Sequence, residues 1–246
     1  MSEGIKSKDR VDKYGEVFTP HEIVVDMVNL GDTETIPIEK TYFEPACGDG
    51  QFLIEILYRK LLTVKNLPVE QRELALVKSL CSIYAVDIQL DNVRESRQRL
   101  LDMAHGKSIE SFTLTNTNFI YEPINLGINF TDKLDRTMEF IVKRNIQCGN
   151  TLTNRKYITD VPKRDKVKEL NIALSTEDDE IGESNIRGAG LENDNYAINL
   201  FGTQYNFDGE YVKMIEEQLN DEIQLPIGAV GKTYNKVHYL ELNTAK

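Results

Sequence analysis

The segment FEPACGDGQFL, from Phe43 to Leu53, constrains the fold of this chain more than any other. It begins in a short β-prone stretch, turns through Gly48 and Gly50, and opens a helix with its apolar residues on one face. A strand that ends in a glycine-rich turn and then starts a helix is where α/β proteins bind nucleotide-like ligands. Glycine lets the backbone approach a ligand closely and tolerates left-handed torsions. The segment therefore predicts an α/β fold with a ligand site at this turn.

Strand-like and helical stretches alternate through the first 150 residues. Apolar residues at helical spacing predict helices over 20–30, 51–62, 69–80 and 91–103. Short β-prone runs predict strands over 40–43 and 81–86, and a third pairing held by 138–142 and 146–148. This alternation is typical of a doubly wound, mostly parallel sheet with right-handed crossovers.

The pattern weakens at both ends of the chain. We expect residues 1–12 to be loose, 175–195 to form a long loop, 211–219 a helix and 233–242 a terminal strand. The sequence thus predicts a core over residues 1–153. A divergent and irregular C-terminal part, 154–246, would complete the sheet or contact a partner or DNA.

Composition narrows the class of protein. The chain has 246 residues and no apolar run near the roughly 20 residues that a membrane helix needs. The first residues have no apolar core, so we expect no secretory signal. Three scattered cysteines without a CxxC pair argue against a disulfide framework or structural zinc, and favour the cytoplasm. The net charge of −11 argues against a strong grip on DNA by the whole surface.

Basic residues nevertheless cluster in two places, over residues 6–13 and 155–168. Each cluster can be a solvated face or a local contact with nucleic acid. A run of like charges favours the solvated face.

The acidic residues near the glycine turn indicate the chemistry of the ligand. Asp87, at the tip of the second strand, is placed to accept hydrogen bonds from a ribose diol. The turn lacks G-x-G-x-x-G, and its distance from Asp87 exceeds the roughly 20 residues of a dinucleotide fingerprint. Glu44 would repel a pyrophosphate but suits a ligand with positive charge. S-adenosylmethionine, with its ammonium and sulfonium groups, fits this site better than NAD or FAD.

Four segments resemble the motifs of the amino-group DNA methyltransferases, especially the adenine-N6 enzymes related to type I restriction-modification subunits. The segment EPACGDG at 44–50 resembles their glycine motif, and GEVFTP at 15–20 resembles their N-terminal motif. The segments YAVDI at 84–88 and NIQCGNTL at 145–152 resemble the next two motifs. Their order is that of the gamma arrangement. The resemblance covers residues 13–153 and implies a Rossmann-like class I methyltransferase fold.

The resemblance also implies which residues hold the cofactor. The glycines would let the backbone pass under the methionine moiety, with Glu44 and Asp49 near its ammonium group. The segment 18–20 would close the pocket, with Thr19 near the methionine carboxylate. The implied S-adenosylmethionine contacts are Phe18, Thr19, Pro20, Glu44, Pro45, Ala46, Gly48, Asp49, Gly50, Asp87, Ile88 and Asn150.

Three of these contacts concern the nucleoside. Asp87 would bind the ribose hydroxyls, and Ile88 would pack on the adenine ring. Asn150 would reach the adenine amine at a position where the family usually has Asp. The direct methyl transfer that the resemblance implies needs no metal.

One motif of the family is missing. Its [DNS]-P-P-[YF] motif holds the target amine, and its aromatic ring stacks on the flipped base. This chain has no Pro-Pro pair, and the nearest look-alike is NDNY at 193–196. Three hypotheses follow: an active adenine-N6 DNA methyltransferase with a partner or specificity subunit, a catalytically silent S-adenosylmethionine-binding module, or one piece of a split enzyme.

Overall fold

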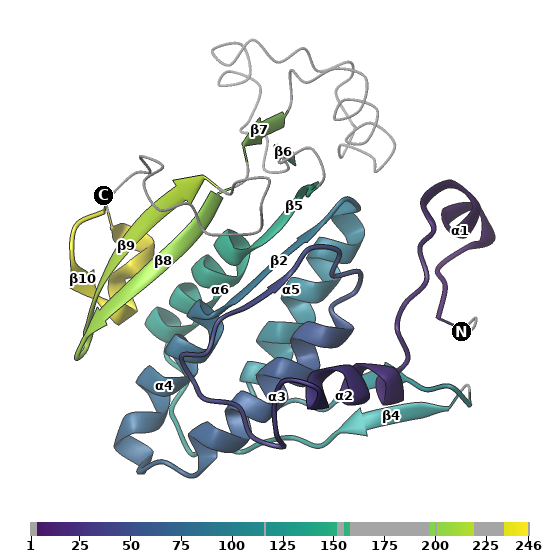
Figure 1. Ribbon diagram of the computed structural model, residues 1–246. Helices are drawn as coiled ribbons and strands as arrows, with labels where there is room; N and C mark the ends of the chain where they lie inside the picture. Colours follow the sequence, from purple (N-terminus) through teal and green to yellow (C-terminus); the bar gives the residue numbers. More distant parts are fainter. Residues whose placement is uncertain are drawn as a thin grey trace.

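The computed structural model describes residues 4–115, 117–151, 155–157, 197–199, 201–218 and 234–245. These residues form a mixed α/β structure, shown in Figure 1. The helices are α1 (Lys8–Tyr14), α2 (His21–Asn29), α3 (Gln51–Lys65), α4 (Val69–Cys81), α5 (Leu90–Ala104), α6 (Asp132–Asn145) and the 3-10 helix η2 (Tyr239–Thr244). The strands are β1 (Tyr42–Glu44), β2 (Ile83–Asp87), β3 (Ile109–Phe112), β4 (Asn118–Tyr121), β5 (Ile146–Asn150), β6 (Arg155–Tyr157), β7 (Ala197–Asn199), β8 (Phe201–Asp208), β9 (Tyr211–Gln218) and β10 (Val237–His238).

The central sheet has the strand order β1-β2-β5-β6-β7. Strands β1, β2 and β5 run parallel, with Glu44 beside Ala85 and Ala85 beside Ile146. Strands β6 and β7 continue the sheet in antiparallel orientation. Because β1, β2 and β5 point the same way, the turns that follow them meet at one edge of the sheet. The three parallel strands confirm the predicted parallel core.

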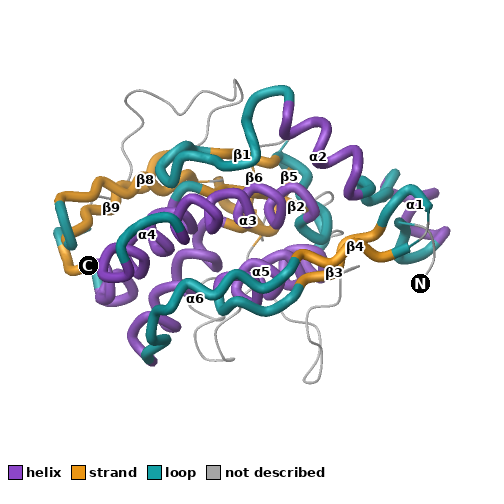
Figure 2. Tube along the Cα trace, turned by 90° about the horizontal axis from the view of Figure 1, so that it is seen from below, coloured by secondary structure: helices purple, strands orange, loops and turns teal. Residues whose placement is uncertain are grey.

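Helices α3, α4, α5 and α6 lie together on one side of the parallel strands (Figure 2). In α3 the side chains of Leu53, Leu57, Leu61 and Val64 are fully buried. Their spacing of three and four residues places them on one face of the helix. The same periodicity, visible in the sequence, correctly predicted α2, α3, α4 and α5. The described helices that pack on the strands form a single layer, so the predicted second layer is not seen among them.

The C-terminal residues form a second sheet, in the order β10-β9-β8, which packs beside α6. Val212 and Met214 of β9 are buried, whereas Tyr211 and Lys213 are exposed. This two-residue alternation is that of a strand, and β9 pairs with β8 along its whole length. The predicted helix over 211–219 is therefore wrong.

Three other predictions of secondary structure fail. Residues 138–142 belong to α6, which Thr131 caps by accepting a hydrogen bond from the Leu134 N–H. Of the described part of the strand predicted over 233–242, only Val237 and His238 form a strand, because the chain then turns into η2. Residues 8–12 are helical, since the Ser7 side chain caps α1. The loop predicted over 175–195 lies outside the described residues. None of the helices in the described ranges is long and apolar enough to cross a membrane.

Candidate functional site

The glycine turn joins the end of β1 to the start of α3. Gly48 and Gly50 both have left-handed torsions, with φ of 53° and 91°. The turn is tied to β2, because the Cys47 N–H donates to the Val86 carbonyl at 3.0 Å. The Gly48 N–H donates to Asp87 Oδ2 at 2.9 Å. The two acidic segments that the sequence singles out, 44–50 and 84–88, are therefore in direct contact.

Asp87 lies at the end of β2 and is 8% exposed. Besides Gly48, it accepts hydrogen bonds at Oδ1 from the Gln89 N–H at 2.8 Å and from Asn92 Nδ2 at 3.3 Å. Burial raises the pKa of this carboxyl, although the three hydrogen bonds act in the opposite direction. Each carboxylate oxygen has two lone pairs, so Asp87 retains room for a further donor at Oδ2.

Phe18 connects the N-terminal motif to the turn. A Cβ atom added to Gly48 would lie 3.0 Å from Cδ1 of the Phe18 ring. The Phe18 N–H is held by the Gly4 carbonyl at 2.8 Å. Thr19 and Pro20 follow, half-buried, and Pro20 is the N-cap residue of α2. The structure thus brings Phe18, the first residue of the predicted segment 18–20, to the glycine turn.

Two carboxyl groups of the turn lie in unusual environments. Burial raises the pKa of Glu44, and the negative charge of Asp87 raises it further. Burial also raises the pKa of Asp49, against the effect of the Arg99 guanidinium 3.1 Å away. Asp49 Oδ2 accepts from Gln51 Nε2 at 2.8 Å, but within the described chain its buried Oδ1 has no partner. Burial therefore makes the ionised forms of Glu44 and Asp49 less favourable than they would be in water.

Helix α5 contributes three residues that the sequence analysis missed. Ser96 Oγ donates to the Gly48 carbonyl at 2.8 Å, and Arg99 Nη1 donates to the Asp49 carbonyl at the same distance. Asn92, one turn before Ser96, reaches Asp87. Residues 92, 96 and 99 recur at helical spacing, and Asn92 and Ser96 are fully or almost fully buried. The sequence signal that could have revealed them is the recurrence of these polar residues at helical spacing on one amphipathic helix.

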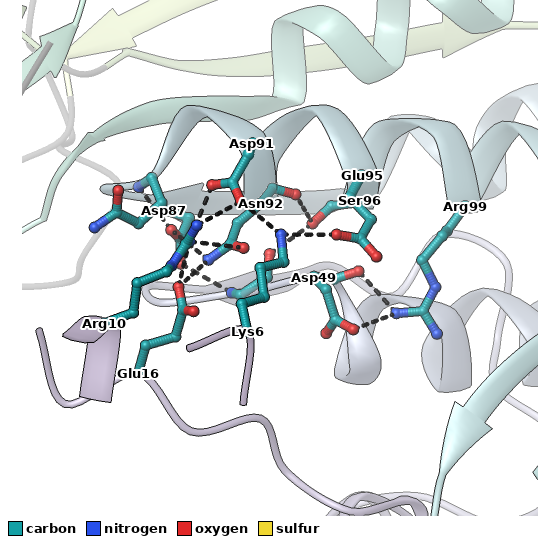
Figure 3. A network of polar contacts seen from close by, with 12 residues as sticks. Lys6, Arg10, Glu16, Asp49, Asp87, Asp91, Asn92, Glu95, Ser96 and Arg99 are labelled. Carbon is teal, nitrogen blue, oxygen red and sulfur yellow. Dashed lines mark hydrogen bonds and ion pairs between the residues drawn. The ribbon is translucent and has the colours of Figure 1, made fainter. Parts of the chain in front are cut away.

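A segment before the N-terminal motif also packs onto the site (Figure 3). Lys6 contacts Asp91 and Glu95 at 2.7 and 2.8 Å. Arg10 contacts Asp91 and Glu16 at 2.6 Å each. Lys6 and Arg10 of the first basic cluster are thus paired within the protein, whereas Lys8 and Lys13 are exposed. Of the second basic cluster, only 155–157 is described, as strand β6.

The end of β5 lies beside the same turn. Cys148 is the register partner of Asp87, and Asn150 is the last residue of β5. The next residue, Thr151, donates from Oγ1 to the Pro45 carbonyl at 2.7 Å. Ile88 is half-buried, and its carbonyl accepts from Cys148 Sγ at 3.8 Å.

The remaining predicted residues of the turn border the same edge of the sheet. Ala46 donates its N–H to Glu44 Oε1 at 3.2 Å, and both Pro45 and Ala46 are exposed. The segment 193–196, weighed as a catalytic motif, lies outside the described residues. Among the described residues, no group of three or more His, Cys, Asp or Glu side chains could hold a metal ion.

The arrangement can recognise a ligand that supplies donors and positive charge. It gathers three carboxyl groups at one edge of the sheet, and the burial that raises their pKa values makes their charge costly without a cation nearby. Comparison with protein-family models, curated proteins and solved structures gives no match to this chain. The functional argument therefore depends on the site itself and on the motifs.

Proposed function

We propose that this site binds S-adenosylmethionine, and that the chain is an adenine-N6 DNA methyltransferase or its cofactor-binding subunit. The observation that carries the proposal is the direct contact of three motif segments. The Gly48 N–H bonds to Asp87, and the Phe18 ring lies on Gly48, at the carboxyl ends of parallel strands. Ligands of open α/β sheets bind at this edge. The proposal includes a Rossmann-like class I methyltransferase fold.

Electrostatics supports a cationic ligand over a dinucleotide. Glu44, Asp49 and Asp87 are carboxyl groups whose pKa values burial raises. A pyrophosphate would add negative charge to this group, whereas an ammonium or a sulfonium would stabilise the ionised carboxylates. Oδ1 of Asp49, which has no partner among the described residues, is an acceptor suited to the ammonium of the methionine moiety.

The residues present fit the cofactor, which would supply an electrophilic methyl group. Asp87 would hold the ribose hydroxyls, and Phe18 would keep water from the glycine turn. Ser96 and Asn92 would fix the turn and the Asp87 carboxylate in position. The target adenine would leave the DNA stack to reach the methyl group.

A second hypothesis is a silent binding module or one part of a split enzyme. Strand β1 ends the described sheet, and Phe43 at this edge is 36% exposed. A partner that continued the sheet beyond β1 could supply the residues that hold the target amine. The net charge of −11 also favours recognition of DNA through another subunit.

Calorimetry tests the cofactor assignment. We expect S-adenosylmethionine to bind the wild type and to lose measurable binding in Asp87→Ala and Gly48→Val. Asp208→Ala and Gly209→Val are matched controls, because Asp208 is an exposed acid and Gly209 has a similar φ of 59° with nothing within 4 Å of an added Cβ. Unchanged binding in both site variants would contradict the proposal.

Methyl transfer separates the two hypotheses. Purified protein, alone and with proteins that copurify with it, would be incubated with tritiated S-adenosylmethionine and unmethylated DNA. Incorporation into adenine supports the enzyme. Cofactor binding without incorporation under either condition supports the silent module.

A further inference from the structure

Glu16 has a buried acceptor that the cofactor contacts assigned above do not use. Its side chain is 9% exposed. Its Oε2 accepts hydrogen bonds from Arg10 Nη2 at 2.6 Å and Asn92 Nδ2 at 2.8 Å. Its Oε1 is buried and has no partner among the residues that the structure describes. Because a buried acceptor without a donor is destabilising, a ligand that donates a hydrogen bond here would be stabilised.

The Glu16 carboxylate is linked to Asp87 through Asn92. Nδ2 of Asn92 donates to Glu16 Oε2 and to Asp87 Oδ1, so one amide group is shared by two carboxylates. Figure 3 shows the three side chains converging at the start of α5. Both carboxylates therefore lie within hydrogen-bond distance of one amide nitrogen.

The surroundings favour a neutral donor over a cation at Glu16. The Arg10 guanidinium lies 2.6 Å from Glu16 Oε2 and already compensates its charge. A second cation would be repelled by Arg10, whereas a hydroxyl would not. A hydroxyl can also accept a hydrogen bond. Nearby Gln89, whose N–H bonds to Asp87, has a buried Nε2 donor that lacks a partner within the described ranges.

We propose that Glu16 and Asp87 together bind the vicinal hydroxyls of a ribose, one hydroxyl on each carboxylate. Arg10 and Asn92 are positioning residues that hold the Glu16 carboxylate in place. The inference rests on the proposed function only in placing a nucleoside at Asp87, and it makes the site specific for ribonucleosides. It assigns the N-terminal segment a direct contact with the ligand.

A ligand series tests the inference independently of the methyl donor. Calorimetry would compare adenosine with 2′-deoxyadenosine and 3′-deoxyadenosine on the full chain, with S-adenosylmethionine measured in parallel. Loss of one hydroxyl should weaken binding roughly tenfold to hundredfold, as expected for a hydrogen bond to a charged group. Equal affinity for all three nucleosides would overturn the inference.

Two variants separate a ligand contact from a purely structural role. Glu16→Gln keeps an oxygen for Arg10 and Asn92 but turns an NH₂ group toward the ligand. We expect it to lose most of the discrimination against one of the two deoxynucleosides. Asp9→Asn is the control, because it breaks an exposed pair with Lys13 in the same segment and leaves the Glu16 acceptor and its partners intact, so it should keep the discrimination. Full discrimination in Glu16→Gln, or equal loss in both variants, would overturn the inference.

The parallel measurement distinguishes this inference from the proposed function. Binding of S-adenosylmethionine without discrimination among the nucleosides would overturn the ribose subsite and support the cofactor assignment. Discrimination among the nucleosides without S-adenosylmethionine binding would support the ribose subsite and overturn the cofactor assignment. A wild type that binds none of these ligands would overturn both.

Discussion

The Phe18 ring lies directly on Gly48, so that a Cβ atom at this glycine would approach Phe18 Cδ1 to 3.0 Å. The two residues are thirty positions apart in the sequence and belong to different predicted motifs. Their contact closes the N-terminal segment onto the glycine turn. It also makes Gly48 sensitive to substitution for two reasons, its positive φ and the nearby ring.

Gly48→Ala should therefore cost more stability than a change at a glycine with similar torsion. The left-handed conformation alone costs a non-glycine residue roughly 1–2 kcal/mol. Gly209→Ala should show only this cost, because nothing lies within 4 Å of an added Cβ there. Chemical denaturation should give a larger loss for Gly48→Ala. Phe18→Leu, combined with Gly48→Ala, should recover part of the difference, and equal losses at the two glycines would contradict this account.

The ion pairs of Arg10 should control the docking of the N-terminal segment. Asp91→Ala removes a partner of both Lys6 and Arg10. We expect amide exchange at Phe18, whose N–H bonds to Gly4, to accelerate at least severalfold. The free energy of unfolding should change by less than about 1 kcal/mol, because the pairs are partly exposed.

Asp9→Ala is the control for this experiment, since its pair with Lys13 is exposed. It should leave the exchange rate at Phe18 unchanged. An unaltered rate in Asp91→Ala would show that the segment is held by other contacts.

Affinity for S-adenosylmethionine should fall as the pH is lowered from about 7.5 toward 5. Burial raises the pKa values of Glu44, Asp49 and Asp87 in the free protein. A cationic ligand prefers the ionised carboxylates, so binding releases protons from the fraction of these groups that is protonated, and this fraction grows as the pH falls. Calorimetry in buffers of different ionisation enthalpy would measure this release. Adenosine, which is uncharged, is the control and should depend less on pH.

The raised pKa values of these carboxyl groups have the opposite effect on the stability of the free protein, which they lower as the pH rises. A carboxyl whose folded-state pKa is raised contributes stability below its unfolded pKa, and this contribution is lost as the pH rises through the folded value. The ligand should therefore stabilise the protein most at neutral pH. Equal stabilisation at pH 5 and 7.5 would argue against a cationic ligand.

Lys60 should make stability rise with pH above neutrality. It is fully buried, donates to the carbonyls of Pro37, Ile38 and Lys40, and has its pKa lowered by burial to about 7. At pH values between about 7 and the ordinary pKa of lysine, Lys60 binds more protons in the unfolded chain than in the folded protein. Stability should then increase with pH by at most roughly 1.4 kcal/mol per unit. Denaturation of wild type and Lys60→Met from pH 7 to 9.5 would measure it, and parallel profiles would contradict it.

Local periodicity explains which elements the sequence predicted. Helix α3 and strand β2 were found because their burial follows the chain's own apolar pattern, with Leu53, Leu57 and Leu61 on one face. Strand β9 was missed, although Val212 and Met214 alternate with exposed residues, because the same short run also suits a helix. A short apolar run does not distinguish strand from helix until its partner strand is known.

The sequence by itself determined that a glycine turn follows a parallel strand and that acids lie near it. Those features are local, since they depend on backbone torsions and on residue order. Only the tertiary structure decided that Phe18 covers Gly48, that Asn92 joins Glu16 to Asp87, and that Arg10 is paired inward. These contacts join segments dozens of residues apart, and they form because β1, β2 and β5 end at one edge of the sheet, where α5 begins.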